Sequence, residues 1–407
     1  MNNYSTNHPI IPNNSEYIRN RKQVSIHSED RNVEKFPSAA HFEIELPEDI
    51  VNVERAQIIS WSFPSNYDVF SVANKNLLMT FKLNGVVQPI PDTVPSTPYL
   101  EALNLLYVLL SAAPANEHEY EVVIQPGSYN PQQFVLEIQN RMNESVQDYC
   151  VQLLTDAGRP DLATAYLDGT LTTYGGYNGF SVAFNIVSNK VWFANNNAAF
   201  ILTNTSEKIN KSLASLYCVW KTLPDYSNWG LPSFIGLTPE NTSSKVATRP
   251  MDYRFYYVNY KSGDWVNIDP NYPNASINYV ECPNKINLMG PSDIYVDIDG
   301  LNHIDETAPF NVSKFTRETN MTNGKPNASF AKIPVIGVPL SMFFDNTISD
   351  MNFKYFDPPA ERIRKLSISI RYHNGLLVDF QTFNYTIVIE FTTYDPRIAT
   401  NYKMRRR

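Results

Sequence analysis

The sequence has little cysteine, and the three cysteines present are far apart. Cys150, Cys218 and Cys282 form none of the paired spacings that bind zinc or make a redox disulfide. This scarcity excludes a small disulfide-stapled fold and predicts buried, reduced thiols. The first nine residues also have no apolar core of the kind a signal peptide requires, so we do not expect export by the usual secretory route.

Excess positive charge and long hydrophobic runs are absent as well. The formal net charge is −8, which argues against a nucleic-acid-binding protein, because binding to phosphates needs a clustered positive field. The longest apolar stretch, Leu100–Ala113, contains Glu101 and Asn104 and is shorter than the ~20 residues needed to span a bilayer. It predicts a buried or docked helix, and a helix that fills a partner's groove is the alternative.

The residues that are present describe a globular chain with many turns. Hydrophobic residues make up 43% and aromatic residues 13% of 407 residues, enough for a substantial core. The 28 prolines and many asparagines predict much non-helical backbone.

The C-terminal part carries the clearest strand pattern. Apolar and polar residues alternate in Leu366–Phe380 and again in Tyr385–Thr393. The Asn374-Gly375 pair tolerates the positive φ angles of a tight turn, so the pattern predicts a hairpin. His41–Leu46 and Val51–Trp61 show the same two-residue period, and we expect both ends of the chain to enter one sheet.

The predicted fold is mainly β: an antiparallel, jelly-roll-like β-sandwich with inserted short helices and extended termini. Helices are expected at about 98–113 and 131–167, the latter broken at Gly158-Arg159-Pro160. Phe180–Phe193 predicts another hairpin that turns on Ser188-Asn189-Lys190.

Along the chain, the composition suggests five consecutive segments. These are a polar N-terminal arm (1–35), a β-sandwich part with the helical insertions (36–203), an aromatic, loop-rich region (204–290), a C-terminal β part that completes the sandwich (291–396), and a basic tail (397–407).

No catalytic, cofactor-binding or metal-binding residue is predicted. The histidines have no second ligand at a useful spacing, and the group from His303 to Glu306 lies in a polar loop of the kind that collects such residues. The glycines of Tyr174–Gly179 lack the Lys-Ser/Thr pair of a phosphate-binding loop. A glycan-cleaving enzyme would need an acid and a base that the sequence does not identify, because such carboxylates meet in space.

The order of several short motifs resembles that of minor capsid or virion structural proteins of nucleocytoplasmic large DNA viruses. The motifs are Ser28–Arg31, Phe36–Pro47, Asn52-Val53, Pro126–Asn130 before a helix, Phe180–Phe193, Ile336–Leu340, and Ile363–Ile370 with Gly375 and Asp379-Phe380. Residues 96–116 and 215–275 depart from this pattern.

The resemblance implies a non-enzymatic cement protein that links or supports capsomers in an icosahedral virus particle. The partners that it implies are the major capsid protein capsomers and other minor capsid proteins, with an internal membrane as a further surface, and no specific nucleic acid. The implied location is the capsid shell of a virion assembled in the infected cell.

Two terminal segments carry the residues expected to contact such partners. The N-terminal arm could wrap a neighbour and become ordered on binding. In the C-terminal basic tail, Tyr402–Arg407 has four cations in six residues. These cations could attract acidic capsomer surface, lipid headgroups or packaged DNA. The expected interface residues are Ile10, Ile11, Arg19, Arg21, Lys22, Lys403, Arg405, Arg406 and Arg407.

A virion-surface module that binds carbohydrate for host attachment is the alternative function. Exposed aromatic rings on a sandwich face could stack on sugar rings, and the candidates are Trp220, Tyr226, Trp229 and Trp265. The ordinary explanation, which we favour, is that these aromatic residues fill the core or the seam between protein partners.

Overall fold

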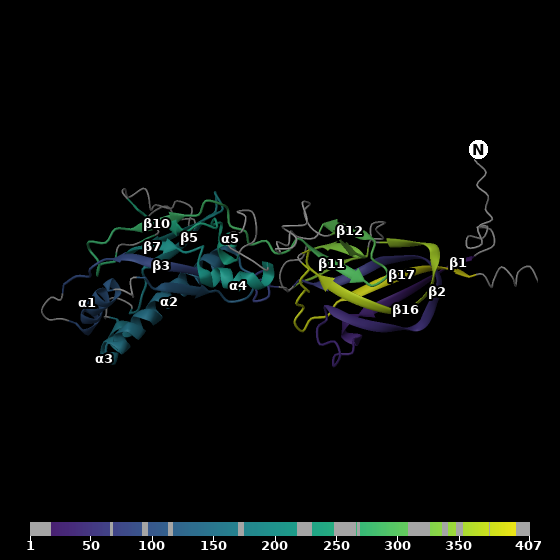
Figure 1. Cartoon of the computed structure of the whole chain (residues 1–407), viewed down its shortest axis with the longest axis horizontal. Helices are drawn as coiled ribbons and strands as arrows, with labels where there is room; N and C mark the ends of the chain where they lie inside the picture. Colours follow the sequence, from purple (N-terminus) through teal and green to yellow (C-terminus); the bar gives the residue numbers. More distant parts are fainter. Residues whose placement is uncertain are drawn as a thin grey trace, which may run out of the picture. The chain divides into compact units, whose positions relative to one another are not determined.

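The structure is a computed structural model (Figure 1), and it describes residues 18–65, 68–91, 97–112, 117–169, 175–217, 230–247, 266, 269–307, 326–335, 341–346, 353–373 and 375–395. The chain divides into two compact units. The terminal unit comprises residues 1–68 and 289–407, and the inserted unit comprises residues 69–288. Each unit has its own hydrophobic core.

The terminal unit is built on one antiparallel sheet. Its strands are β1 (Ile18–His27), β2 (His41–Pro64), β11 (Asp293–Ile298), β14 (Ala331–Pro334), β15 (Met342–Asp345), β16 (Phe353–Arg371) and β17 (Thr386–Asp395). The strand order is β1-β17-β2-β16-β11-β14, and β15 pairs with β2. A separate ladder joins β12 (Ile304–Thr307) to β13 (Pro326–Ser329), and a short 3-10 turn, η1 (Ser28–Asp30), follows β1. Both ends of the chain therefore enter one sheet, as the alternating pattern predicts.

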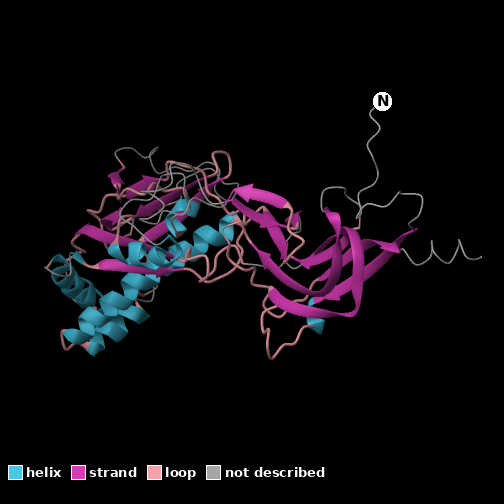
Figure 2. Ribbon diagram, turned by 45° about the vertical axis from the view of Figure 1, so that its right-hand side comes forward, coloured by secondary structure: helices cyan, strands magenta, loops and turns pink. Residues whose placement is uncertain are grey.

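The sheet curls because its long strands change partners along their length. On one side β2 pairs with β16 over residues 41–57, and on the other side it pairs with β17 over residues 53–62. The alternating apolar residues of β16 and β17 face the inside of this curve and are buried; they are Leu366, Ile368, Ile370, Ile387, Ile389 and Phe391. Figure 2 shows these long strands curving round the core of the unit.

The C-terminal hairpin expected from Asn374-Gly375 is wrong as a pairing of two long strands. A tight turn does occur there: Tyr372 and Leu376 are hydrogen bonded, and Gly375 has a φ of 84°. The ladder stops after the Arg371–Leu377 bridge, however, and β16 and β17 then pair with opposite sides of β2. Because β2 has 24 residues, it offers two long edges at once, and this outweighs the local turn signal.

The two alternating segments His41–Leu46 and Val51–Trp61 belong to a single strand, because β2 is continuous through Pro47. The β2–β16 register shifts between the Ile50–Ile363 and Glu45–Lys365 pairs, so residues 46–49 have no register partner in β16. Proline lacks an N–H donor, and this irregularity is where a strand tolerates it.

The inserted unit contains two four-stranded sheets and the helices. One sheet has the order β4-β3-β7-β8, from β3 (Leu78–Val86), β4 (Glu119–Val123), β7 (Ala198–Leu202) and β8 (Thr242–Ser243). The other has the order β5-β6-β10-β9, from β5 (Phe180–Asn185), β6 (Lys190–Asn195), β9 (Lys245–Val246) and β10 (Asn278–Glu281). The β5–β6 pair is the hairpin predicted for Phe180–Phe193.

Helices α1 (Pro98–Ser111), α2 (Pro131–Asp156) and α3 (Pro160–Asp168) occur where the sequence predicts helices. The sequence does not predict α4 (Glu207–Tyr217) and α5 (Leu231–Ile235), which lie in the region expected to be rich in loops. Each of the first three begins with proline, whose missing N–H costs nothing at a helix start. Asn130 and Gln133 form a reciprocal capping box at α2, which buries Phe134, Ile138 and Met142.

The two units differ from the five consecutive segments that the composition suggests. Residues 18–27 of the expected arm form strand β1, and the region 204–290 contributes helices and short strands to the inserted unit. Among the helices of the described residues, none has the length and apolar composition needed to cross a membrane.

Candidate functional site

The first strand, β1, lies at one end of the terminal unit's sheet and is paired on one side by β17. Ten residue pairs run without a register shift from Ile18–Asp395 to His27–Thr386. The Ser28 N–H donates to the Tyr385 carbonyl at 3.0 Å, which continues this ladder by one residue. Since the direction of the backbone groups alternates along a strand, the odd-numbered residues of β1 point their N–H and C=O groups away from β17.

Of the three expected interface residues on this strand, Arg19 and Arg21 are exposed and Lys22 is half-buried, and each has a carboxylate partner. Arg19 lies 2.7 Å from Glu54, Arg21 lies 3.8 Å from Glu390, and Lys22 lies 3.2 Å from Glu48. The exposed fractions of their side chains are 59%, 73% and 36%, so water competes strongly for these pairs. The other expected interface residues, Ile10, Ile11, Lys403, Arg405, Arg406 and Arg407, lie outside the described residues.

Arg31 organises the loop that leads from β1 to β2. Its guanidinium donates to the carbonyl oxygens of Ser28 at 2.7 Å, Phe36 at 3.0 Å and Pro37 at 2.9 Å. A further bond at 3.3 Å reaches the Asn384 side chain, just before β17. Two of the motifs that carry the family resemblance, Ser28–Arg31 and Phe36–Pro47, are thus joined by one side chain that shapes the backbone.

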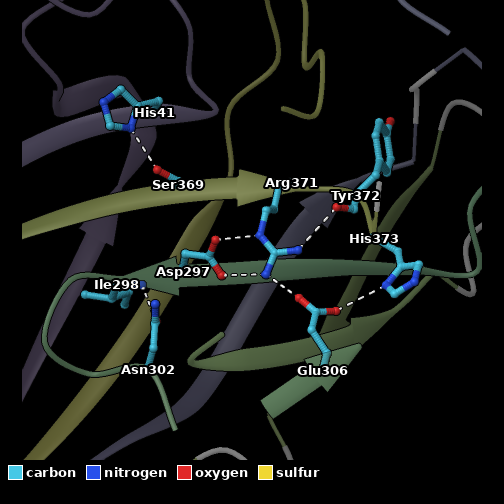
Figure 3. Close-up of polar contacts among 9 residues, drawn as sticks. All are labelled: His41, Asp297, Ile298, Asn302, Glu306, Ser369, Arg371, Tyr372 and His373. Carbon is cyan, nitrogen blue, oxygen red and sulfur yellow. Dashed lines mark hydrogen bonds and ion pairs between the residues drawn. The ribbon is translucent and has the colours of Figure 1, made fainter. Parts of the chain in front are cut away.

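A buried polar cluster links three strands of the terminal unit (Figure 3). Arg371, the last residue of β16, donates from Nε to Asp297 Oδ2 at 2.6 Å and from Nη2 to Asp297 Oδ1 at 3.2 Å. The same Nη2 donates to Glu306 on β12, whose second oxygen lies 3.2 Å from His373 Nδ1. The guanidinium also lies 5.1 Å from the ring centroid of Tyr295, its register partner on β11.

Burial sets the electrostatics of this cluster. It raises the pKa of the Asp297 carboxyl, although the hydrogen bonds from Arg371 act in the opposite direction. Burial alone would lower the pKa of Arg371, but its bonds to Asp297 and Glu306 more than compensate and raise it. The guanidinium therefore stays charged and is shared by two carboxylates.

The side chains of this cluster are arranged to hold elements of the fold together. Both oxygens of Glu306 have partners, so the carboxylate of Glu306 is not free to bind a ligand. Within the described ranges, no group of three or more His, Cys, Asp or Glu side chains is arranged to hold a metal ion. What the cluster can do is fasten β12 and the turn after β16 to the main sheet.

Neither Arg371 nor Asp297 stands out as a functional residue in the sequence, and Arg31 stands out only as the last residue of the motif Ser28–Arg31. A signal was present for Asp297, which lies between the apolar run Ile294–Val296 and Ile298 of β11, but not for Arg371, because β16 carries several other charged residues. A charged residue in such a strand needs a partner, since burying an unpaired charge is costly.

The cysteines and the aromatic residues proposed to bind sugar are the remaining residues that the sequence singles out. Cys150 and Cys282 are free and buried, and burial raises the pKa of Cys150 to about 12, so this thiol stays protonated. Cys218 lies outside the described residues, as do Trp220, Tyr226, Trp229 and Trp265, which the carbohydrate-binding alternative requires.

Comparisons with known proteins give distant structural similarities. No protein-family model matches the chain, and neither does any curated protein. Among solved structures, the mavirus penton protein matches with 9% identity and a TM-score of 0.37, over 93% of this chain and 99% of that one. A chain of the Sputnik virophage structure matches with 11% identity and a TM-score of 0.36, over 92% and 98%. TM-scores this low do not establish a common fold.

Proposed function

We propose that the chain is a structural protein of a virion and that it acts as a minor capsid, or cement, protein. In this role it links or supports the major-capsid-protein capsomers of a large DNA virus. The observation that carries the proposal is the pairing of Ile18 with Asp395, which brings the start and the end of the described fold to one point.

This pairing makes the two terminal segments neighbours at their origin. The 17 residues before Ile18 and the 12 residues after Asp395 leave the sheet from adjacent strands. At ~3.5 Å per extended residue they could reach roughly 60 Å and 40 Å, far enough to contact adjacent subunits. The later segment contains five cations and no carboxylate side chain, which suits acidic capsomer surface or lipid headgroups.

The residues of the family resemblance support a structural role through what they do in the fold. Arg31 holds a loop by its carbonyl groups, Asn130 caps α2, and Gly127 exchanges two backbone hydrogen bonds with Phe70. These contacts position elements of the fold. A folded unit from which both terminal segments start side by side suits the role of a cement protein.

Quantitative mass spectrometry of purified particles tests the proposal. We expect the chain at a fixed copy number relative to the major capsid protein, and we expect it to remain with the shell after gentle removal of soluble proteins. Replacing Lys403, Arg405, Arg406 and Arg407 with glutamine should lower incorporation at low salt, and the difference from the unmodified chain should shrink as salt is added, because salt screens the attraction.

The matched control is Lys211→Gln, which removes an exposed cation of α4 outside the tail. Incorporation of this variant should equal that of the unmodified chain. Absence of the chain from particles, or substrate turnover by the isolated protein, would contradict the proposed function.

A further inference from the structure

The outer edge of β1 is long and regular, and it pairs with no strand among the residues that the structure describes. Edge strands of soluble proteins are usually short, bulged or interrupted by proline, because free N–H and C=O groups invite another strand. The other outer strands of this sheet, β14 and β15, have four residues each, and β14 ends at Pro334. In contrast, β1 has ten residues with no proline and no register shift.

The backbone of β1 presents a defined set of groups to the outside. The Ser28–Tyr385 hydrogen bond fixes the phase of the ladder, so the outward groups belong to Arg19, Arg21, Gln23, Ser25 and His27. An added strand would bond to these five residues. It would leave the β1–β17 hydrogen bonds untouched, because those belong to the even-numbered residues.

The side chains of β1 indicate what kind of strand fits. The strand carries Arg19, Arg21 and Lys22 and no acidic residue. Arg19 and Arg21 are mostly exposed, although their partners Glu54 and Glu390 are only 15% and 14% exposed. The exposed part of each guanidinium can therefore bind a further carboxylate without giving up its present partner. On the core face, Ile26 is buried and Val24 packs against the core from the edge, so a neighbour there would extend the apolar layer.

Charge also distinguishes between two possible occupants. Pairing β1 with β1 of a second copy would bring six cations to one seam, and neither strand would supply a carboxylate. A strand with carboxylates at alternate positions would instead face Arg19 and Arg21 on the outer face.

From this geometry we propose that the outer edge of β1 binds an extended acidic segment of another virion protein by β-strand addition. The partner segment has carboxylates on the face of Arg19 and Arg21 and apolar residues on the face of Val24 and Ile26. This inference rests on the proposed function for the identity of the partner, but the edge and its chemistry do not depend on that function.

The test uses the full chain and a labelled ten-residue peptide in which glutamate alternates with valine. Fluorescence anisotropy should show binding that weakens as salt is added. Ser25→Pro removes an outward N–H without removing a β1–β17 hydrogen bond, and it should weaken binding at least about tenfold, or 1.4 kcal/mol. The unfolding temperature of the variant should stay unchanged, and a shuffled peptide without alternation should bind poorly.

A second variant keeps the proposal falsifiable if Ser25→Pro unfolds the unit. Arg19→Gln with Arg21→Gln retains the backbone edge, and it should weaken peptide binding and flatten its salt dependence. Lys211→Gln is the control, because it also replaces an exposed cation with glutamine but lies outside β1. This variant should bind the peptide as tightly as the unmodified chain does.

Three results would overturn the proposal. They are no binding of the peptide to the full chain, binding by both β1 variants that is as tight as binding by the unmodified chain, and binding only after residues 1–17 are removed. The last result would mean that the chain's own N-terminal segment occupies the edge. Particle incorporation is measured separately, so failure of peptide binding and failure of the proposed virion role can be told apart.

Discussion

Arg371 and Glu306 form an ion pair between β16 and β12 in which the side chains are only 6% and 8% exposed. Removing one partner of a buried pair leaves an uncompensated charge and commonly costs about 3–5 kcal/mol. We expect Arg371→Met to lower the free energy of unfolding of the terminal unit by about that amount, because Asp297 also loses its partner. Glu306→Gln should cost less, since an amide oxygen still accepts from Arg371. Urea unfolding curves measure both changes.

The control for this prediction is an exposed ion pair on the same strand. Arg362 lies 3.4 Å from Asp49 in solvent, and such pairs contribute under about 1 kcal/mol. Arg362→Met should therefore leave the unfolding curve nearly unchanged. Equal losses for Arg371→Met and Arg362→Met would contradict a structural role of the cluster.

Arg31 provides the second prediction, in which a conservative substitution should fail. Lysine retains the charge, but it cannot place separate donors on the carbonyls of Ser28, Phe36 and Pro37 as the planar guanidinium does. We expect Arg31→Lys to destabilise the terminal unit by about 1–3 kcal/mol and to speed amide hydrogen exchange in residues 32–40. Unchanged exchange in this loop would show that Arg31 does not hold it.

The sequence predicts the elements of this fold better than their pairing. Helices α1, α2 and α3 and the β5–β6 hairpin follow from proline starts, apolar spacing and local turns, which all lie within a few residues. The pairing of β16 with β2, in contrast, joins residues some 300 positions apart, such as Phe42 and Ile368. No local pattern encodes such a contact, which explains why the C-terminal turn suggested a hairpin that the long strand β2 replaces.

The same distinction applies to the candidate site. The sequence shows that the N-terminal segment carries the cations of β1. It does not show that they lie on an edge strand of the sheet, because that position follows from the pairing of β1 with β17, at the other end of the chain. The Arg371 cluster draws its members from β16, β11, β12 and a turn, so only the three-dimensional structure brings them together.

Tyr385 gives the third prediction, a substitution that should stabilise the protein. Its ring is buried and stacks on Phe63 at 4.8 Å, but its hydroxyl has no hydrogen-bond partner among the described residues. An unsatisfied buried polar group costs about 1–3 kcal/mol, and Phe retains the ring packing. We expect Tyr385→Phe to raise the free energy of unfolding of the terminal unit by about 1 kcal/mol.

The matched control is the same substitution at Tyr177 in the inserted unit. The Tyr177 hydroxyl accepts from Asn195 Nδ2 and donates to Asn197 Oδ1, both at 2.8 Å. Tyr177→Phe leaves both groups without this partner and should destabilise the protein by about 1–3 kcal/mol. Opposite signs for the two variants support the assignment, and a loss of stability in Tyr385→Phe would refute it.

His118 gives a pH-dependent prediction for the inserted unit. Burial and then the nearby charge of Lys208 lower the pKa of this imidazole below its usual 6.5, while the unfolded chain keeps the usual value. Below pH 6.5 the unfolded state therefore binds more protons, so the free energy of unfolding falls as the pH drops toward the folded-state pKa.

His118→Phe keeps the stacking on Tyr149, whose ring centroid lies 3.7 Å away, and should flatten this part of the profile of unfolding free energy against pH. Lys208→Met should reduce the slope only in part, because burial remains. Hydrogen exchange of α2 and β4 at a series of pH values measures the effect, and an unchanged slope in His118→Phe would assign the pH dependence to another group.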